Sequence, residues 1–144
     1  MQISRFTDLG LKVLIYLSYH NMPSTTIARI ADDLQVSKNH LVKVVHFMGQ
    51  QQWLVTMRGK YGGIALARLP QEYFLGELIR HLEKKYQQES MQMRLSEVEC
   101  GVLPMLHCLP EVFQESLEMF YQSLNRYNLA DLNPAQYNGL RLRA

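Results

Sequence analysis

Residues 24–50 read STTIARIADDLQVSKNHLVKVVHFMGQ and hold two helical patterns on either side of a short break. A Ser-Thr-Thr run precedes the first pattern, residues 27–34, and supplies side chains that cap helices. Gln35-Val36 forms the break, and Ser37 is placed to cap a longer second helix that ends near residue 50. Apolar residues of this helix recur at helical spacing, at Leu41, Val44, Val45 and Met48. Two helices joined by a turn of a few residues, the second one basic, indicate a helix-turn-helix.

Two short strand patterns follow directly. Residues 53–57 (WLVTM) and 63–67 (GIALA) read as strands, and the segment between them has the glycines that a hairpin needs. Two cations, Arg58 and Lys60, lie at the tip of this hairpin. We therefore expect a β-wing beside the helix-turn-helix.

Further helices are expected on both sides of this unit. Thr7 is placed to cap a first helix, in which Gly10, Val13, Leu14 and Leu17 follow at helical spacing. After the wing, a helix is expected over residues 76–82, whereas residues 83–94 are polar and show no clear pattern. Residues 95–110 contain two prolines and are expected to form a loop.

An apolar seam follows this loop. Its members are Phe113, Leu117, Phe120, Leu124 and Tyr127. Their spacings of four, three, four and three residues are those of the a and d positions of a coiled coil. Such a seam can pack on its own domain, but we favour dimerisation, because a reader of palindromic DNA needs a two-fold dimer.

The composition is that of a globular protein. Of 144 residues, 47% are hydrophobic and 19% are charged, which excludes a disordered chain. The expected fold class is mostly α with a small β-wing. We expect a winged helix-turn-helix domain at residues 1–82, a linker with a cysteine-containing loop at residues 83–110, and a long C-terminal dimerisation helix and tail at residues 111–144. No signal peptide or membrane span is expected, and two cysteines fit a reduced, cytoplasmic setting.

The charge is unevenly distributed along the chain. Between Asp33 and Glu72 there is no acidic residue, yet five of the fifteen Lys and Arg residues lie there. The rest of the chain holds the other ten and all thirteen acidic residues. A one-sided basic segment in a near-neutral protein indicates a polyanionic partner.

Double-stranded DNA is the expected partner, in the form of a palindromic A·T-rich operator. The second helix of a helix-turn-helix fits the major groove, where Asn39 can pair with an adenine edge and Lys43 can contact phosphate. Arg58 can enter a narrow A·T-rich minor groove. The full set of expected contacts is Ser24, Thr25, Thr26, Ser37, Lys38, Asn39, His40, Lys43, Arg58 and Lys60. A scaffold of the same shape that binds protein instead is the alternative.

The cysteine-containing loop brings Cys100, His107 and Cys108 within nine residues. Thiolates select iron-sulfur clusters, zinc or copper(I), and histidine can replace a thiolate at a cluster iron. The spacing matches no zinc ribbon, and two buried structural cysteines remain the alternative. We expect no enzyme, because the sequence has no nucleophile elbow, phosphate-binding glycine loop, dinucleotide fingerprint or His-Glu metal motif.

Four segments resemble the winged-helix regulators typified by NsrR and IscR. They are RFTDLGLKVLIYL (5–17), VSKNHLVKVVHFM (36–48), TMRGKYGGIALA (56–67) and RYNLADL (126–132). The resemblance spans the chain except for a longer stretch before Cys100, and it is stronger to the nitric-oxide-responsive NsrR branch. It implies a homodimeric repressor that binds a palindromic operator and carries an iron-sulfur cluster.

The resemblance also implies a set of cluster ligands. In NsrR-like proteins three cysteines of the loop and the aspartate of a TD motif from the partner subunit hold the cluster, and the aspartate here is Asp8. This loop has two cysteines: Cys108 matches the third, and Cys100 matches the first or second. We therefore favour a two-iron cluster with mixed ligands, Asp8, Cys100, Cys108 and His107, over a four-iron cluster. A cluster-free regulator or interaction protein with a degenerate loop is the other possibility.

Overall fold

A computed structural model describes residues 3–19, 24–59, 62–90 and 109–132. This part of the chain is mostly helical, with five α-helices, a two-stranded antiparallel sheet and short 3-10 turns. The elements are α1 (Arg5–Tyr19), α2 (Ile27–Leu34), α3 (Lys38–Gln50), β1 (Leu54–Met57), β2 (Gly63–Leu66), η1 (Pro70–Glu72), α4 (Leu75–Ser90), α5 (Leu109–Leu124) and η4 (Leu129–Leu132). None of the described helices is long and apolar enough to cross a membrane.

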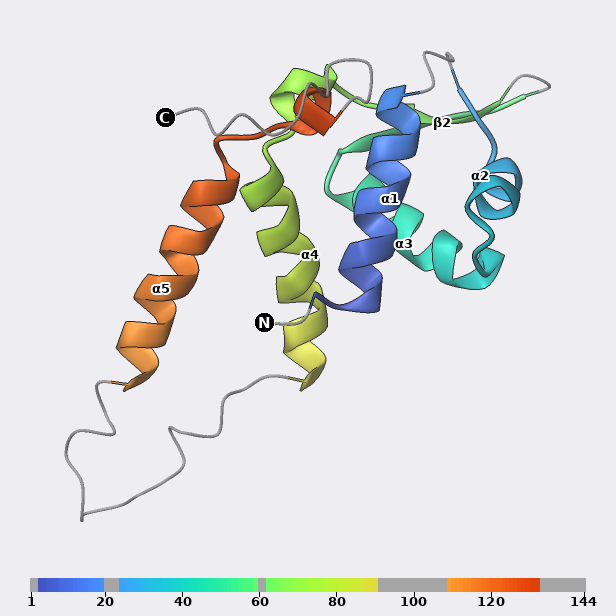
Figure 1. Cartoon of the computed structure of the whole chain (residues 1–144). Helices are drawn as coiled ribbons and strands as arrows, with labels where there is room; N and C mark the ends of the chain where they lie inside the picture. The colour runs from blue at the N-terminus through green and yellow to red at the C-terminus, as the bar shows by residue number, and fades with distance from the viewer. Residues whose placement is uncertain (1–2, 20–23, 60–61, 91–108, 133–144) are drawn as a thin grey trace.

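Helix α1 is the centre of the arrangement (Figure 1). On one side it contacts α2, α3 and β2, and on the other it contacts α4 and η4. Helices α4 and α5 lie side by side in opposite directions, with α5 on the far side of α4 from the helix-turn-helix. The fold therefore places a helical pair beside a winged helix-turn-helix.

One hydrophobic core joins these parts. Its members come from every described helix except α5, together with the wing and η4: Leu9, Val13, Leu14, Ile30, Leu41, Val44, Met48, Trp53, Ile64, Tyr73, Leu78, Leu82 and Leu129 are among the buried residues. Edge-to-face ring contacts add a second connection, since Phe6 of α1 touches Phe47 of α3, and Phe47 touches Trp53. A displacement of α3 would therefore disturb α1 and the base of the wing.

The start of α1 differs from the sequence-based expectation. Ser4, not Thr7, caps the helix: its Oγ accepts a hydrogen bond from the Thr7 backbone N–H at 3.1 Å. The Ser4 N–H in turn donates to a carboxylate oxygen of Glu83 on α4 at 2.8 Å. Thr7 is fully buried inside the first turn. The capping prediction for Thr7 was wrong because Ser4 takes the cap with help from a residue 79 positions away.

The predicted helices of the helix-turn-helix are confirmed, and so are the two strands of the wing to within a residue. Helix α4, however, continues to Ser90 and so includes most of the segment that showed no clear pattern. The predicted boundary at residue 82 consequently falls inside a continuous helix. At the start of this additional part, Glu83 is buried and its carboxylate accepts from the Ser4 N–H.

The apolar seam of α5 is divided between two environments. Leu124 and Tyr127, at its C-terminal end, pack against the core of their own chain. Phe113, at its N-terminal end, is 52% exposed, and Leu117 and Phe120 are half-buried. Val112 and Met119, which are not members of the predicted seam, are 56% and 57% exposed. Only part of the seam is thus used within the chain.

Candidate nucleic-acid interface

The turn between α2 and α3 is set by a single left-handed residue. Gln35 has a φ of 52°, and its backbone N–H donates to Asp32 O at 3.2 Å. The next N–H, of Val36, donates to Ala31 O at 3.0 Å, which closes α2 and lets α3 begin at Lys38. This tight closure holds the start of α3 in place.

A hydrogen bond from α1 fixes the orientation of this unit. The Tyr16 hydroxyl donates to the Asp33 carboxylate at 2.5 Å, and Arg29 lies 3.8 Å from the same carboxylate. The hydrogen bond to Asp33 and partial desolvation raise the pKa of Tyr16. The end of α2 is therefore tied to the central helix.

Helix α3 separates apolar from polar side chains as the sequence predicted. Leu41, Val44, Val45 and Met48 are buried, and the predicted contact residues Ser37, Lys38, Asn39, His40 and Lys43 are exposed. Ser37 occupies the N-cap position without a side-chain capping bond, so its hydroxyl remains available to a ligand. The N-cap and the first two turns of α3 thus present two cations and three hydrogen-bonding groups on the surface.

The wing holds Arg58 next to the end of β1. The strands pair in antiparallel register from Leu54 opposite Leu66 to Met57 opposite Gly63. Gly59 has a φ of 106°, and a Cβ at Gly63 would lie 2.5 Å from Thr25 O, so the hairpin needs glycine at both positions. Arg58 is exposed. Lys60 lies outside the described residues.

Ser24, Thr25 and Thr26 lie beside the wing and differ in exposure. Thr25 is 6% exposed and forms a bridge with Ile64 through two backbone hydrogen bonds of 3.1 and 2.7 Å. Its side chain is therefore part of the interior, not of the surface. Thr26 is exposed and caps α2 by accepting from the Arg29 N–H, and Ser24 is half-buried.

The charge of this surface is not neutralised within the described part of the chain. The ion pairs found there are Lys12–Asp8, Arg29–Asp33 and Arg80–Glu118. None of them includes Lys38, Lys43 or Arg58. These three cations remain free to attract a polyanion.

Two further residues of this surface were missed by the sequence analysis. Val42 is 44% exposed, and His46 is exposed one turn later. Both lie on the same side of α3 as Lys43 and Asn39, at helical spacings of three and four. An apolar residue between two exposed polar positions of the second helix was the available signal for Val42.

The predicted metal ligands are mostly outside the described residues. Cys100, His107 and Cys108 all lie there. Asp8 is in the first turn of α1, its side chain is 56% exposed, and its carboxylate accepts from Lys12 Nζ at 2.7 Å. Within the described ranges, no group of three or more His, Cys, Asp or Glu residues is placed to hold a metal ion.

Comparison with known proteins identifies the family. The Rrf2 family, described as an iron-dependent transcriptional regulator, matches residues 3–135. An HTH-type transcriptional regulator NsrR of Bacillus licheniformis is 34% identical over 140 residues, covering 92% of each chain. An NsrR of Shouchella clausii is 33% identical over 135 residues, covering 92% of this chain and 88% of the relative.

Solved structures share the same fold. CymR, the global cysteine regulator of B. subtilis, superposes with a TM-score of 0.69 at 24% identity, over 96% of this chain and 99% of that one. IscR of T. potens gives 0.66 at 19% identity, over 92% and 85%. With its winged helix-turn-helix, its unneutralised basic surface and these relatives, the chain belongs to the Rrf2 family: it is a DNA-binding transcriptional regulator similar to NsrR, and not an enzyme.

Proposed function

We propose that two copies of this chain bind a palindromic A·T-rich operator as a repressor, and that an iron-sulfur cluster sensing nitric oxide or redox state controls the affinity. Operator binding is supported by the exposed surface of α3 and the wing. The cations of this surface have no acidic partner in the described part of the chain. The similarity to NsrR supports the sensing part.

The contacts to DNA divide into two kinds. Lys38 and Lys43 bind phosphates and set the position of α3, because a lysine is a flexible point charge. Asn39 reads an adenine edge in the major groove, and Arg58 reads the minor groove beside it. Ser37, His40, Thr26, Ser24 and Lys60 complete the polar contacts.

Val42 adds an apolar contact to these polar contacts with DNA. An exposed valine on a major-groove helix can contact the C5-methyl group of thymine, which the other bases lack. With Asn39 three residues earlier, it suits a T·A step in an A·T-rich half-site.

The second copy packs against the exposed part of α5. Val112 and Met119 are seven residues apart and so share one face of the helix, and both are more than half exposed, as is Phe113 between them. Pairing of two such faces by a two-fold axis would bury all three side chains and place two α3 helices on one side of the dimer.

Asp8, Cys100, Cys108 and His107 are the residues that would hold the cluster. Two thiolates, an imidazole and a carboxylate suit a two-iron cluster with mixed ligands. Asp8 fits this role because its carboxylate is exposed on the first turn of α1 and, among the described residues, is bound only by Lys12, so it can reach a group on another subunit. When bound, the cluster supplies a centre that reacts with nitric oxide. Asp8 would connect that centre to α1, which contacts both α2 and α3.

The experiment combines a spectrum with operator binding of the same anaerobic samples. Cys100→Ala and Cys108→Ala should abolish the visible chromophore and change operator affinity in the direction that nitric oxide does. Asp8→Asn should shorten the cluster lifetime, because it replaces an anionic ligand by a neutral one. Glu111→Gln, an exposed acid in the first turn of α5, is the matched control.

A cluster-free regulator is the competing outcome. Asp8 already has a role without metal, since an acidic residue in the first turn stabilises the helix dipole by about 0.3–1 kcal/mol. Unchanged spectrum, cluster lifetime and DNA response in Asp8→Asn would leave it a helix-stabilising residue and refute the cross-subunit ligand.

A further inference from the structure

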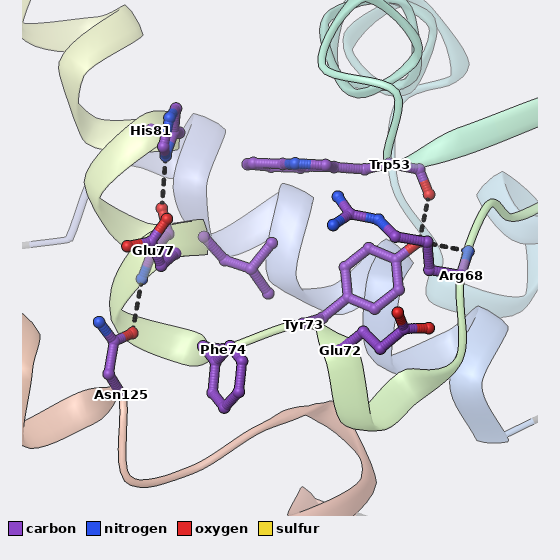
Figure 2. Close-up of a pocket in the computed structure, with 9 residues that line it drawn as sticks. Trp53, Arg68, Glu72, Tyr73, Phe74, Glu77, His81 and Asn125 are labelled. Carbon is purple, nitrogen blue, oxygen red and sulfur yellow. Dashed lines mark hydrogen bonds between the residues drawn. The ribbon is translucent and has the colours of Figure 1, made fainter.

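A pocket of about 460 Å³ lies between the base of the wing, the first turns of α4 and the residue that follows α5. Figure 2 shows Trp53 and Arg68 on one wall and Glu77, His81 and Asn125 on the other, with Phe74 below. Its size is typical of pockets for small ligands. None of these residues belongs to the predicted DNA contacts or cluster ligands.

Arg68 is held in place on the first wall. Its guanidinium lies between the Trp53 indole and the Tyr73 ring in Figure 2, with Cζ 5.2 Å from the Tyr73 ring centre. Its backbone N–H donates to the Tyr73 hydroxyl at 3.0 Å, and that hydroxyl donates to Trp53 O at 2.7 Å. No carboxylate of the described chain forms an ion pair with Arg68. The stacked guanidinium can therefore direct its N–H groups into the pocket, where they suit a carboxylate.

The opposite wall offers a negative charge and further polar atoms. The Glu77 backbone N–H donates to Asn125 Oδ1 at 2.9 Å, which orients the Asn125 amide and leaves its NH₂ for a ligand. The Glu77 carboxylate has no hydrogen bond or ion pair among the described residues, although its charge acts on Arg80. His81 Nδ1 lies 2.8 Å from Glu77 O and donates to it, because a carbonyl oxygen only accepts.

The remaining lining is apolar. Phe74 is 47% exposed although it is large and hydrophobic, and it faces the pocket together with Leu78 and Trp53. A ligand with a hydrocarbon or aromatic part would cover the exposed Phe74 ring. The pocket thus has a cationic wall, an anionic wall and an apolar surface between them.

The geometry points to a small zwitterion, a free α-amino acid with an apolar side chain, as the ligand of this pocket. Its carboxylate would bind Arg68, its ammonium Glu77, and its side chain Phe74 and Leu78. A simple anion fits less well, because the lining carries two carboxylates, Glu72 and Glu77, against one guanidinium. Trp53 touches Phe47 of α3, and Asn125 follows α5, so the ligand would contact both the DNA-reading unit and the helical pair.

Trp53 gives a direct readout, because it is the only tryptophan of the chain. The twenty proteinogenic L-amino acids would be titrated one at a time, up to millimolar concentration, into the purified full chain while tryptophan emission is followed, with calorimetry as a second measurement. We expect saturable binding of at least one apolar amino acid. The corresponding acid without the amino group and the amine without the carboxyl group should both bind more weakly.

Arg68→Met and Glu77→Gln should each weaken binding at least about tenfold, since each removes one charged partner of the ligand. Arg126→Met, an exposed arginine outside the pocket, should bind as the parent does. No saturable change with any amino acid, or equal binding by folded Glu77→Gln, would overturn the proposal. The assay contains no DNA, so its outcome is independent of the proposed operator binding.

Discussion

Tyr73 connects three segments through one hydroxyl group. It is 1% exposed, accepts from the Arg68 N–H and donates to Trp53 O, and so holds the end of β2 and the start of β1 against η1. Removal of this hydroxyl leaves the Arg68 N–H without its acceptor, whereas Trp53 O still accepts from the Ala67 N–H at 3.0 Å.

Tyr73→Phe should therefore lower the free energy of unfolding by about 1–3 kcal/mol. The measurement is the midpoint of denaturant unfolding at constant slope. Tyr127→Phe is the control, because the half-buried Tyr127 packs on the core and has no hydrogen bond to its hydroxyl in the described part of the chain. Equal midpoints for the two variants would contradict the role given to the Tyr73 hydroxyl.

Truncation of Arg58 and truncation of Lys43 should change DNA binding in different ways. Arg58→Ala should weaken operator binding by about 1–3 kcal/mol and relax sequence preference, as loss of a base contact does. Lys43→Ala should weaken all DNA sequences alike and reduce the salt dependence, because it neutralises phosphate. Titrations of operator and scrambled DNA over a salt series separate the two effects. If both variants bind as the parent, neither residue touches DNA.

At the scale of elements, the contact between α4 and α5 depends on Gly76. A Cβ at this position would lie 2.0 Å from Tyr121 O and 2.5 Å from Asn125 Oδ1, both too close for real atoms. Gly76→Ala should thus destabilise the chain by about 1–3 kcal/mol as α4 and α5 are pushed apart. Gly49→Ala near the end of α3 meets nothing within 4 Å and should be neutral or stabilising by about 0.5–1 kcal/mol. Thermal unfolding of both variants tests this difference in stability. A Gly49→Ala variant as destabilised as Gly76→Ala would contradict it.

The same contact carries an acid-sensitive ion pair. Arg80 donates to Glu118 at 2.7 Å and lowers the pKa of that carboxyl below its ordinary 4.5. The stabilisation by this ion pair is fully present above the pKa that Glu118 has in the unfolded chain. It is lost as the pH falls through the lower pKa that Glu118 has in the folded chain. Glu118→Gln should therefore lose less stability than the parent on acidification below pH 4.5, with exposed Glu111→Gln as the control. Parallel stability curves for parent and Glu118→Gln would contradict this.

Local patterns were sufficient to predict the helix-turn-helix and the wing. The stripe from Leu41 to Met48, the break at Gln35 and the glycines of the hairpin are short-range signals, and each element begins and ends near the expected residue. The cap at Ser4 and the length of α4 were not predictable in this way. The cap involves Glu83, whose partner Ser4 is 79 residues away in the sequence, and the polar residues after position 82 showed no periodicity that would have extended α4.

The site was predictable to a similar extent. The exposed side of α3 follows from helical periodicity, and its polar members were predicted individually. The burial of Thr25 depends on pairing with Ile64 in the wing, which no local pattern reveals. The pocket beside Trp53 joins residues from four segments and has no signature in any of them.

For the whole molecule, the decisive question is how two copies assemble. Phe113→Asp with Met119→Asp should give monomers with little operator affinity, because these exposed side chains would carry charges into the proposed interface. Leu124 is unsuitable for this test, since it packs in the core of its own chain. Sedimentation of the double variant as a dimer would refute the assignment, and Gln114→Asp, an exposed polar position of the same helix, should remain dimeric.

The most direct test of the account is operator affinity measured on one anaerobic sample before and after nitric oxide, with the visible spectrum recorded at each step. Cluster-bound and cluster-free states must differ in operator affinity for any regulation to occur. We predict a visible chromophore, tight and salt-sensitive binding to a palindromic A·T-rich site, and a fall in affinity that follows the loss of the chromophore. A protein with stoichiometric iron and sulfide whose operator affinity is the same before and after nitric oxide would contradict it.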